Sequence, residues 1–189
     1  MAHYRKIDVR IWNDAKFISL SNNGKLIFLF LITHPGMTAL GAMRTSLPGL
    51  AAELDMKQEA FDEAFHEALE EGMVKANLKA SCIWLPNFLK YQSAESPNVI
   101  KNWIKQLEFI PECNLKNLAI IELKTFVEGL SEGYRKAFND AFPKDILNTV
   151  SSKQLAVIPN QGEFLPSQDR DLSNTKILNN GKIQELRSA

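Results

Sequence analysis

Residues 46–88 hold two helix patterns, a short break between them and two strand patterns directly afterwards, and this order limits the folds open to the chain. The first pattern begins at Ser46, a capping residue, and has Pro48 in its first turn. A second helix pattern ending at Gly72 follows, with one apolar side formed by Phe61, Ala64, Phe65, Ala68 and Leu69. The stretches "MVKAN" and "ASCIWLPNF" then predict a hairpin of two strands.

The residues before this unit supply the other parts of a winged helix-turn-helix. "YRKIDVRIW" alternates in a way that favours a short strand or an extended arm. A helix is expected from the cap Ser21 to a stop signal at residues 34–36, and its middle, apolar all round, indicates a central place in the core. "LGAMRT" is a short strand candidate. The order of helix, strand, helix, turn, helix and hairpin is that of a winged helix-turn-helix.

The rest of the chain predicts a helical extension and a polar tail. Ser96 and Pro97 open one helix, and two more are separated near Gly129 and ended by Pro143. The last residues are rich in Ser, Asn and Gln and predict a flexible tail, whose apolar islands "LAVIP" and "EFLP" suit binding to a partner. We expect a mainly α fold with a small β-hairpin wing, divided into a winged helix-turn-helix domain (1–92), a helical extension (93–148) and a flexible tail (149–189).

Composition favours a cytoplasmic protein without a strong general attraction for nucleic acid. The formal net charge is zero, so the distribution of charge matters more than its total. The longest apolar run, "LIFLFLI", is far too short to span a bilayer, which needs about 20 residues. The N-terminus has no signal-peptide pattern, and no membrane contact is expected.

No pattern in the sequence predicts catalysis or metal binding. Cys82 and Cys113 show no CxxC spacing and the histidines are scattered, so neither a zinc site nor a disulfide framework is expected. "SNNGK" has the wrong spacing for a nucleotide-binding loop. His34 before Pro35 is interpreted as a helix-ending residue. The expectation is a protein that is not an enzyme and needs no metal or other cofactor.

Three stretches carry a resemblance to a known family: "KIDVRIWNDAKFISLSNNGKLIFLFLITHPGMTALGAMR", "LPGLAAELDM" and "IWLPNFLKYQSAESPNVIKNW". The chain resembles, over roughly residues 4–130, a prophage-borne family of phage replication initiator or replication-organising proteins with an N-terminal winged helix. The phrases "LFLITHP", "LPNFLKY" and "SPNVIKNW" are the most specific. Two residues depart from the family pattern: Gly24, where a better helix former is usual, and Lys57, at the cap position of the second helix. The resemblance implies DNA binding in prophage replication.

The outward side of the second helix is acidic, which is unusual for a helix expected to enter a DNA groove. The acidic residues on this side are Glu59, Asp62, Glu63, Glu67 and Glu70. Only Lys57 and Gln58, at its start, suit contact with DNA, since the helix N-terminus itself favours a phosphate. Three interpretations stay open: a solvated helix face, a protein-docking face, and insertion into the major groove.

Basic residues lie elsewhere along the chain and suggest a phosphate-binding rim around the helix-turn-helix, with the wing near a minor groove. The nucleic-acid-binding candidates are Arg5, Lys6, Arg10, Arg44, Lys57, Gln58, Lys75, Lys79, Lys90, Lys101 and Lys105. The alternative is an ordinary solubility coat of lysines. Tyr91 and Trp103 are candidates for stacking on an exposed base, although the helical spacing of Trp103 also fits a core residue.

The favoured hypothesis is a DNA-binding protein of phage or prophage replication that recognises an origin in double-stranded DNA or recruits host replication proteins. One alternative is a winged-helix protein-interaction module, which self-associates or contacts a helicase or its loader through the acidic helix or the tail. A second alternative is a transcriptional regulator with the same fold.

Overall fold

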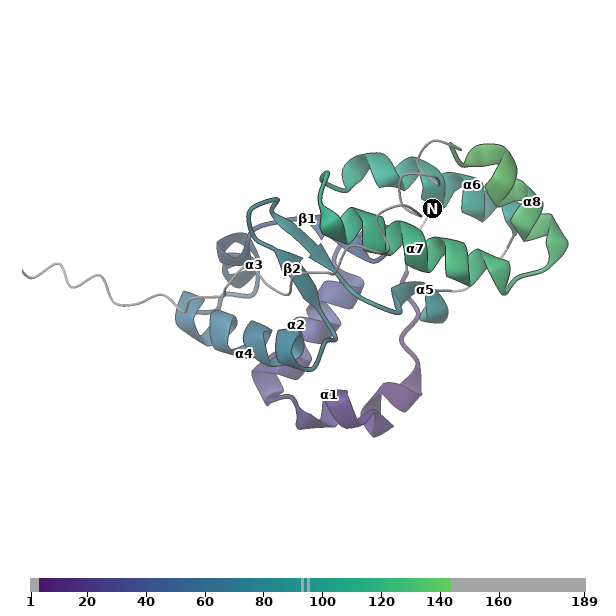
Figure 1. Cartoon of the computed structure of the whole chain (residues 1–189). Helices are drawn as coiled ribbons and strands as arrows, with labels where there is room; N and C mark the ends of the chain where they lie inside the picture. The colour runs from purple at the N-terminus through teal and green to yellow at the C-terminus, as the bar shows by residue number, and fades with distance from the viewer. Residues whose placement is uncertain (1–3, 93, 95, 144–189) are drawn as a thin grey trace, which may run out of the picture.

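The computed structural model of the chain describes residues 4–92, 94 and 96–143 (Figure 1). The predicted mainly helical fold with a small β element is confirmed. The first part contains η1 (Val9–Asn13), α1 (Ala15–Ser19), α2 (Asn22–Thr33), β1 (Ala42–Arg44), α3 (Leu47–Glu53), α4 (Gln58–Glu70), β2 (Lys75–Asn77), β3 (Cys82–Trp84) and α5 (Phe88–Tyr91). The second contains α6 (Pro97–Lys105), η2 (Gln106–Phe109), α7 (Asn114–Glu128) and α8 (Glu132–Ala141). The predicted tail lies outside the described residues.

Helices α2 and α4 form the centre of the first part. The hydroxyl of Ser21 accepts a hydrogen bond from the Gly24 N–H at 3.0 Å and caps α2, as predicted. Gly24 is buried where α2 approaches α4, and a Cβ at this position would lie 2.6 Å from Oε2 of Glu67. This close approach explains why glycine, a weak helix former, stands inside α2.

Helices α3 and α4 follow the predicted bounds closely. The hydroxyl of Ser46 accepts from the Gly49 N–H at 3.3 Å and caps α3. In the turn that follows, Asp55 has a φ of 52°. Helix α4 buries Phe61, Ala64, Phe65 and Ala68, which belong to its predicted apolar side. Gly72, with a φ of 67°, follows the C-cap residue Glu71 and ends α4 as expected.

The sheet has the strand order β1-β3-β2, with both pairs antiparallel. Neighbouring residues along a strand point to opposite faces. Met43 and Ile83 therefore join the core formed with α2, α3 and α4, whereas Ala42, Cys82 and Trp84 join a second core formed with α6, α7 and α8. Helix α7 contacts all three strands. The sheet thus lies between two groups of helices (Figure 1).

Some local predictions are corrected. The strand expected near the N-terminus is wrong, because Val9–Asn13 is a 3-10 helix whose first turn is capped by the Asp8 carboxylate at 2.9 Å from the Arg10 N–H. The alternative prediction for this segment, an extended arm, fits residues 4–8, which have no regular secondary structure. Helix α2 takes the predicted central place in the core, although Leu26 on its surface is 49% exposed. Ser96 precedes α6 as predicted but makes no side-chain capping bond.

Short helices α1 and α5 were missed by the sequence patterns, because four or five residues show too little periodicity to be recognised. Among the described residues, no helix combines the length and the apolar character that crossing a membrane requires.

Candidate functional site

The exposed side of α4 is less uniform than its sequence suggests. Glu59, Glu63 and Glu70 are exposed, whereas Asp62 and Glu67 are partly buried. Oε2 of Glu67 accepts a hydrogen bond from the backbone N–H of Ser21 at 2.7 Å, and Asp62 accepts from the side chain of Gln58 at 2.7 Å. His66 pairs with Glu70 at 3.2 Å. Only part of the predicted acidic face is therefore available to a partner.

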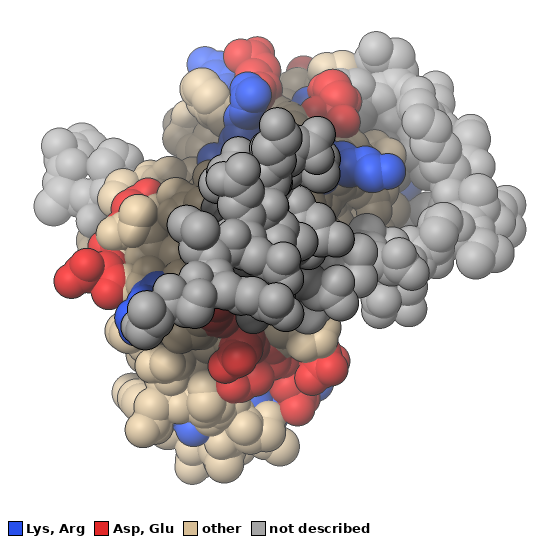
Figure 2. All heavy atoms as spheres, turned by 90° about the vertical axis from the view of Figure 1, so that its left-hand side faces the viewer, with Lys and Arg blue, Asp and Glu red and all other residues tan. Residues whose placement is uncertain are grey.

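The start of α4 and the hairpin turn present cations on one side of the molecule. Lys57 is exposed at the N-cap position of α4 and makes no capping bond with its side chain. Arg44 pairs in register with Cys82, next to the hairpin turn that carries Lys79, and both cations are exposed. The hairpin turn, α3 and α4 lie on the left of Figure 1. Figure 2 views this side and shows several groups of acidic side chains with Lys and Arg between and around them.

The other predicted cations lie on separate elements. Lys75 is half-buried at the far end of β2, and its ammonium lies 5.8 Å from the centre of the Trp84 ring. Lys101 and Lys105 are exposed on α6, which packs against α8. The structure therefore does not gather all the predicted cations around α3 and α4.

Trp103, one of the two stacking candidates, is 5% exposed and packs near Phe126, with 5.9 Å between the ring centres. The core interpretation of Trp103 is confirmed and its role in stacking is excluded. Tyr91, the other candidate, is 44% exposed.

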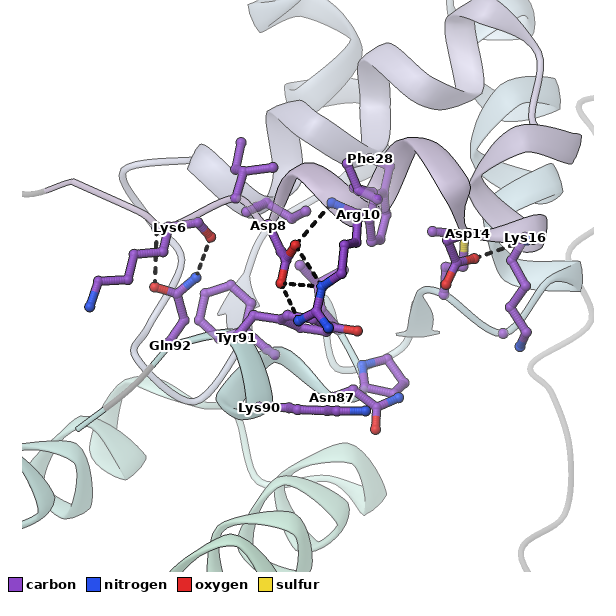
Figure 3. Close-up of a pocket in the computed structure, with 18 of the residues that line it drawn as sticks. Lys6, Asp8, Arg10, Asp14, Lys16, Phe28, Asn87, Lys90, Tyr91 and Gln92 are labelled. Atoms are coloured by element: carbon purple, nitrogen blue, oxygen red, sulfur yellow. Dashed lines mark hydrogen bonds and ion pairs between the residues drawn. The ribbon is translucent and has the colours of Figure 1, made fainter.

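A cavity of about 510 Å³ brings together predicted residues from both ends of the first part. Its walls are the N-terminal segment, α2, the residues after α4 and the residues from Leu85 to Gln92 (Figure 3). Predicted residues in its lining are Lys6, Arg10, Lys90 and Tyr91. Lys16, Asp8, Asp14 and Gln92 also line it and were not predicted. Phe28 and Ile32 of α2 contribute part of its apolar surface.

Gln92 and Arg5 fasten the N-terminal segment in place as a wall of this cavity. The amide of Gln92 donates to the Lys6 carbonyl at 2.9 Å and accepts from the Lys6 N–H at 3.4 Å, as Figure 3 shows. The guanidinium of Arg5 donates to the Met37 carbonyl and lies 5.5 Å from the centre of the Phe88 ring. Half-buried Arg5 thus anchors the segment instead of presenting its charge to DNA as expected.

Acidic groups in the cavity are already engaged with the protein. The carboxylate of Asp8 contacts the guanidinium of Arg10 at 2.5 Å, and this hydrogen-bonded pair lowers the pKa of Asp8 to about 2. Asp14 accepts from the backbone N–H groups of Lys16 and Phe17 and caps α1. The ammonium of Lys16 donates to the Glu71 carbonyl at 2.6 Å. Both carboxylates are therefore engaged by neighbouring groups of the chain, and so are the cations of Arg10 and Lys16.

Glu122 of α7 binds the backbone of Asn87, one of the residues that line the cavity. Its Oε2 accepts from the Asn87 N–H at 2.9 Å, where Asn87 has a φ of 63° just before α5. Burial raises the pKa of Glu122, and hydrogen bonds from the Asn87 and Leu89 N–H groups oppose this shift. Its Oε1 is buried without a hydrogen-bond partner. This carboxylate connects α7 to the segment that carries Lys90 and Tyr91.

Sequence patterns gave no signal for Gln92 or Glu122, since both act through contacts with residues more than 30 positions away. Asp8 and Asp14 had a local signal, because each precedes a short helix and caps it. His34 follows α2, as interpreted, and its ring contacts Glu53 at 2.9 Å.

Within the described residues, no group of His, Cys, Asp or Glu side chains is arranged to hold a metal ion. Burial raises the pKa of the Cys82 thiol to about 12, with a smaller contribution from Cys113.

No family model, no curated protein and no solved structure matches the chain.

Proposed function

We propose that this chain is a DNA-binding protein of phage or prophage replication, which recognises an origin or recruits host replication proteins through a winged helix-turn-helix. The observation that carries the proposal is the order α2-β1-α3-α4-β2-β3 together with the strand order β1-β3-β2. In a winged helix-turn-helix, three helices and a three-stranded sheet follow one another in this way. The replication role rests on the family resemblance of residues 4–130, because the fold alone does not determine a function.

In this proposal, duplex DNA is held at the hairpin turn and at the beginning of α4. Arg44, Lys79 and Lys57 are the exposed cations there. Further along α4, the carboxylates of Glu59, Glu63 and Glu70 oppose deep insertion, because duplex phosphates repel them. If each cation neutralises one phosphate, the logarithm of the binding constant falls with the logarithm of salt concentration with a slope of about −3.

Charge reversal tests this placement in the full chain. Arg44→Glu and Lys79→Glu are each expected to weaken duplex binding and to reduce the magnitude of the salt slope by about 1 or more. Lys101→Glu, a reversal of an exposed lysine on α6, serves as the control and should leave both quantities nearly unchanged. Equal losses in all three variants would indicate a general charge effect and would contradict the placement.

The second candidate function is a protein-interaction module, and the acidic exposed side of α4 favours it. Glu59 and Glu63 are exposed and form a carboxylate surface that suits a basic partner. Here Glu59→Lys and Glu63→Lys would break assembly with the partner and leave DNA affinity unchanged or higher. If these reversals abolished site-specific DNA binding, both this candidate and the shallow DNA contact at α4 would be wrong.

A further inference from the structure

We propose that the cavity between the N-terminal segment and α5 binds single-stranded DNA, at a site separate from the duplex-binding surface proposed above. This inference goes beyond the proposed function, which concerns double-stranded DNA at the hairpin turn and α4. Three properties of the cavity support it: an exposed aromatic ring in its lining, cations that outnumber the carboxylates, and a suitable size.

One exposed aromatic side chain lines this cavity, and two others belong to the N-terminal segment beside it. The large exposed aromatics of the described residues are Tyr4, Trp12, Tyr91 and Phe109. The first two belong to the N-terminal segment, which forms one wall, and Tyr91 lines the cavity itself. Trp12 is 59% exposed, although its ring is held against Phe17 with 5.2 Å between ring centres. Such rings stack on bases of any sequence, since every base has a π face.

Four cations line the cavity together with Tyr91. Lys6, Arg10, Lys16 and Lys90 line the cavity, against the carboxylates of Asp8 and Asp14. The side chain of Arg10 is 79% exposed despite its contact with Asp8. The ammonium of Lys90 lies 5.8 Å from the centre of the Tyr91 ring, and in Figure 3 Lys90 extends toward Asn87. A phosphate and its base would thus meet a cation and a ring from adjacent residues.

The size of the cavity favours a nucleotide of a single strand over a duplex. Its volume of about 510 Å³ lies within the range of roughly 300–1,000 Å³ that encloses small ligands. Part of its surface is apolar, from Phe28 and Ile32 among others, which suits a base removed from water. The site also lies apart from the hairpin turn: α5 is on the right of Figure 1 and the turn is on the left.

The test is fluorescence anisotropy of the full chain with a labelled twelve-nucleotide oligo(dT). Tyr91→Ala should weaken binding roughly five- to 150-fold, the usual effect of losing one stacked base. Tyr91→Phe should restore most of the affinity, because the ring remains. Lys90→Glu should weaken binding and reduce the dependence on salt concentration. Phe109→Ala and Lys101→Glu are matched controls on other elements, expected to change affinity less than twofold.

A duplex probe separates this inference from the proposed function. Tyr91→Ala and Lys90→Glu should leave duplex binding intact, whereas Arg44→Glu and Lys79→Glu should leave oligo(dT) binding intact. Oligo(dT) binding without duplex binding would sustain the inference and contradict the proposed function. Absent oligo(dT) binding, or equal losses in the controls, would overturn the inference. Self-association that Trp12→Ala abolishes, without any oligo(dT) binding, would also overturn it and assign the surface to a protein contact.

Discussion

Oε2 of Glu67 accepts a hydrogen bond from the backbone N–H of Ser21 at 2.7 Å, and this bond joins α4 to the cap of α2. Glu67 is partly buried, whereas Glu63, one turn earlier on α4, is exposed. The two residues look equivalent in the sequence, as outward acids of one helix. The structure separates them, because only Glu67 takes part in packing between helices.

Glu67→Lys is therefore expected to destabilise the protein by about 1–3 kcal/mol, the usual cost of losing a buried or partly buried hydrogen bond to a charged group. Glu63→Lys should change the free energy of unfolding by less than about 0.5 kcal/mol, as surface substitutions usually do. Urea denaturation of both variants measures the difference. Similar values for the two would show that the bond to Ser21 has no effect on stability.

Gly24→Ala tests the close approach of α2 to α4 in two backgrounds. Alanine would normally stabilise a helix interior by about 1 kcal/mol relative to glycine, but its Cβ would lie 2.6 Å from Oε2 of Glu67 and 3.2 Å from Cβ of Leu20. The substitution is expected to destabilise the wild-type protein. In a Glu67→Ala background it should be much less harmful, and a double-mutant cycle of unfolding free energies gives the coupling. Additive effects would rule out the steric explanation.

The raised pKa of Glu122 leads us to expect that this carboxyl lowers the stability of the protein as the pH rises. Because burial raises its pKa above the ordinary value of 4.5, the folded state holds the proton more tightly than the unfolded state. Ionisation therefore costs stability as the pH rises from 4.5 through the folded-state pKa. Glu122→Gln keeps an oxygen for the Asn87 N–H and removes this cost, so its melting temperature should exceed that of the wild type at pH 7.5.

At pH 4 the two melting temperatures should converge, because the wild-type carboxyl is then protonated. Glu122→Ala, the control, removes the acceptor and should be destabilised at both pH values. A glutamine variant that is less stable than the wild type at pH 7.5 would contradict the account of Glu122.

Asp8→Asn should strengthen binding of oligo(dT) up to about fivefold, since an exposed ion pair is weak and its loss releases the Arg10 guanidinium for phosphate. Asparagine keeps an oxygen to accept from the Arg10 N–H, so η1 should stay capped. Anisotropy titrations of the variant and the wild type at one salt concentration provide the measurement. Unchanged affinity would remove Arg10 from the proposed single-strand site.

Local patterns in the sequence predicted most of the helices and strands correctly. Ser21 and Ser46 cap the helices they were expected to begin, and Gly72 ends α4, because capping depends on residues only a few positions apart. The strand near the N-terminus failed as a prediction, since alternation alone does not reveal whether a partner strand exists. The segment instead forms the 3-10 helix η1, which Asp8 caps.

The candidate sites were less predictable than the fold, because they depend on contacts between distant segments. The sequence suggested Lys6, Arg10 and Lys90 as parts of a phosphate-binding rim and Tyr91 as a stacking residue, and only the structure shows that the four line one cavity. Arg5 stood beside them in the sequence but turns inward to Met37 and Phe88. The positions of charged residues in the sequence therefore do not indicate which cations a ligand can reach.

The central claim, sequence-specific binding of duplex DNA, is tested most directly by selection of binding sites from a pool of random duplexes. The full chain is incubated with the pool at two salt concentrations, and the retained DNA is sequenced. We predict enrichment of one site, with an affinity that falls as the salt concentration rises. No enrichment, with affinities no tighter than the roughly 10⁻⁴ to 10⁻⁶ M of non-specific binding, would contradict the claim and favour the protein-interaction module.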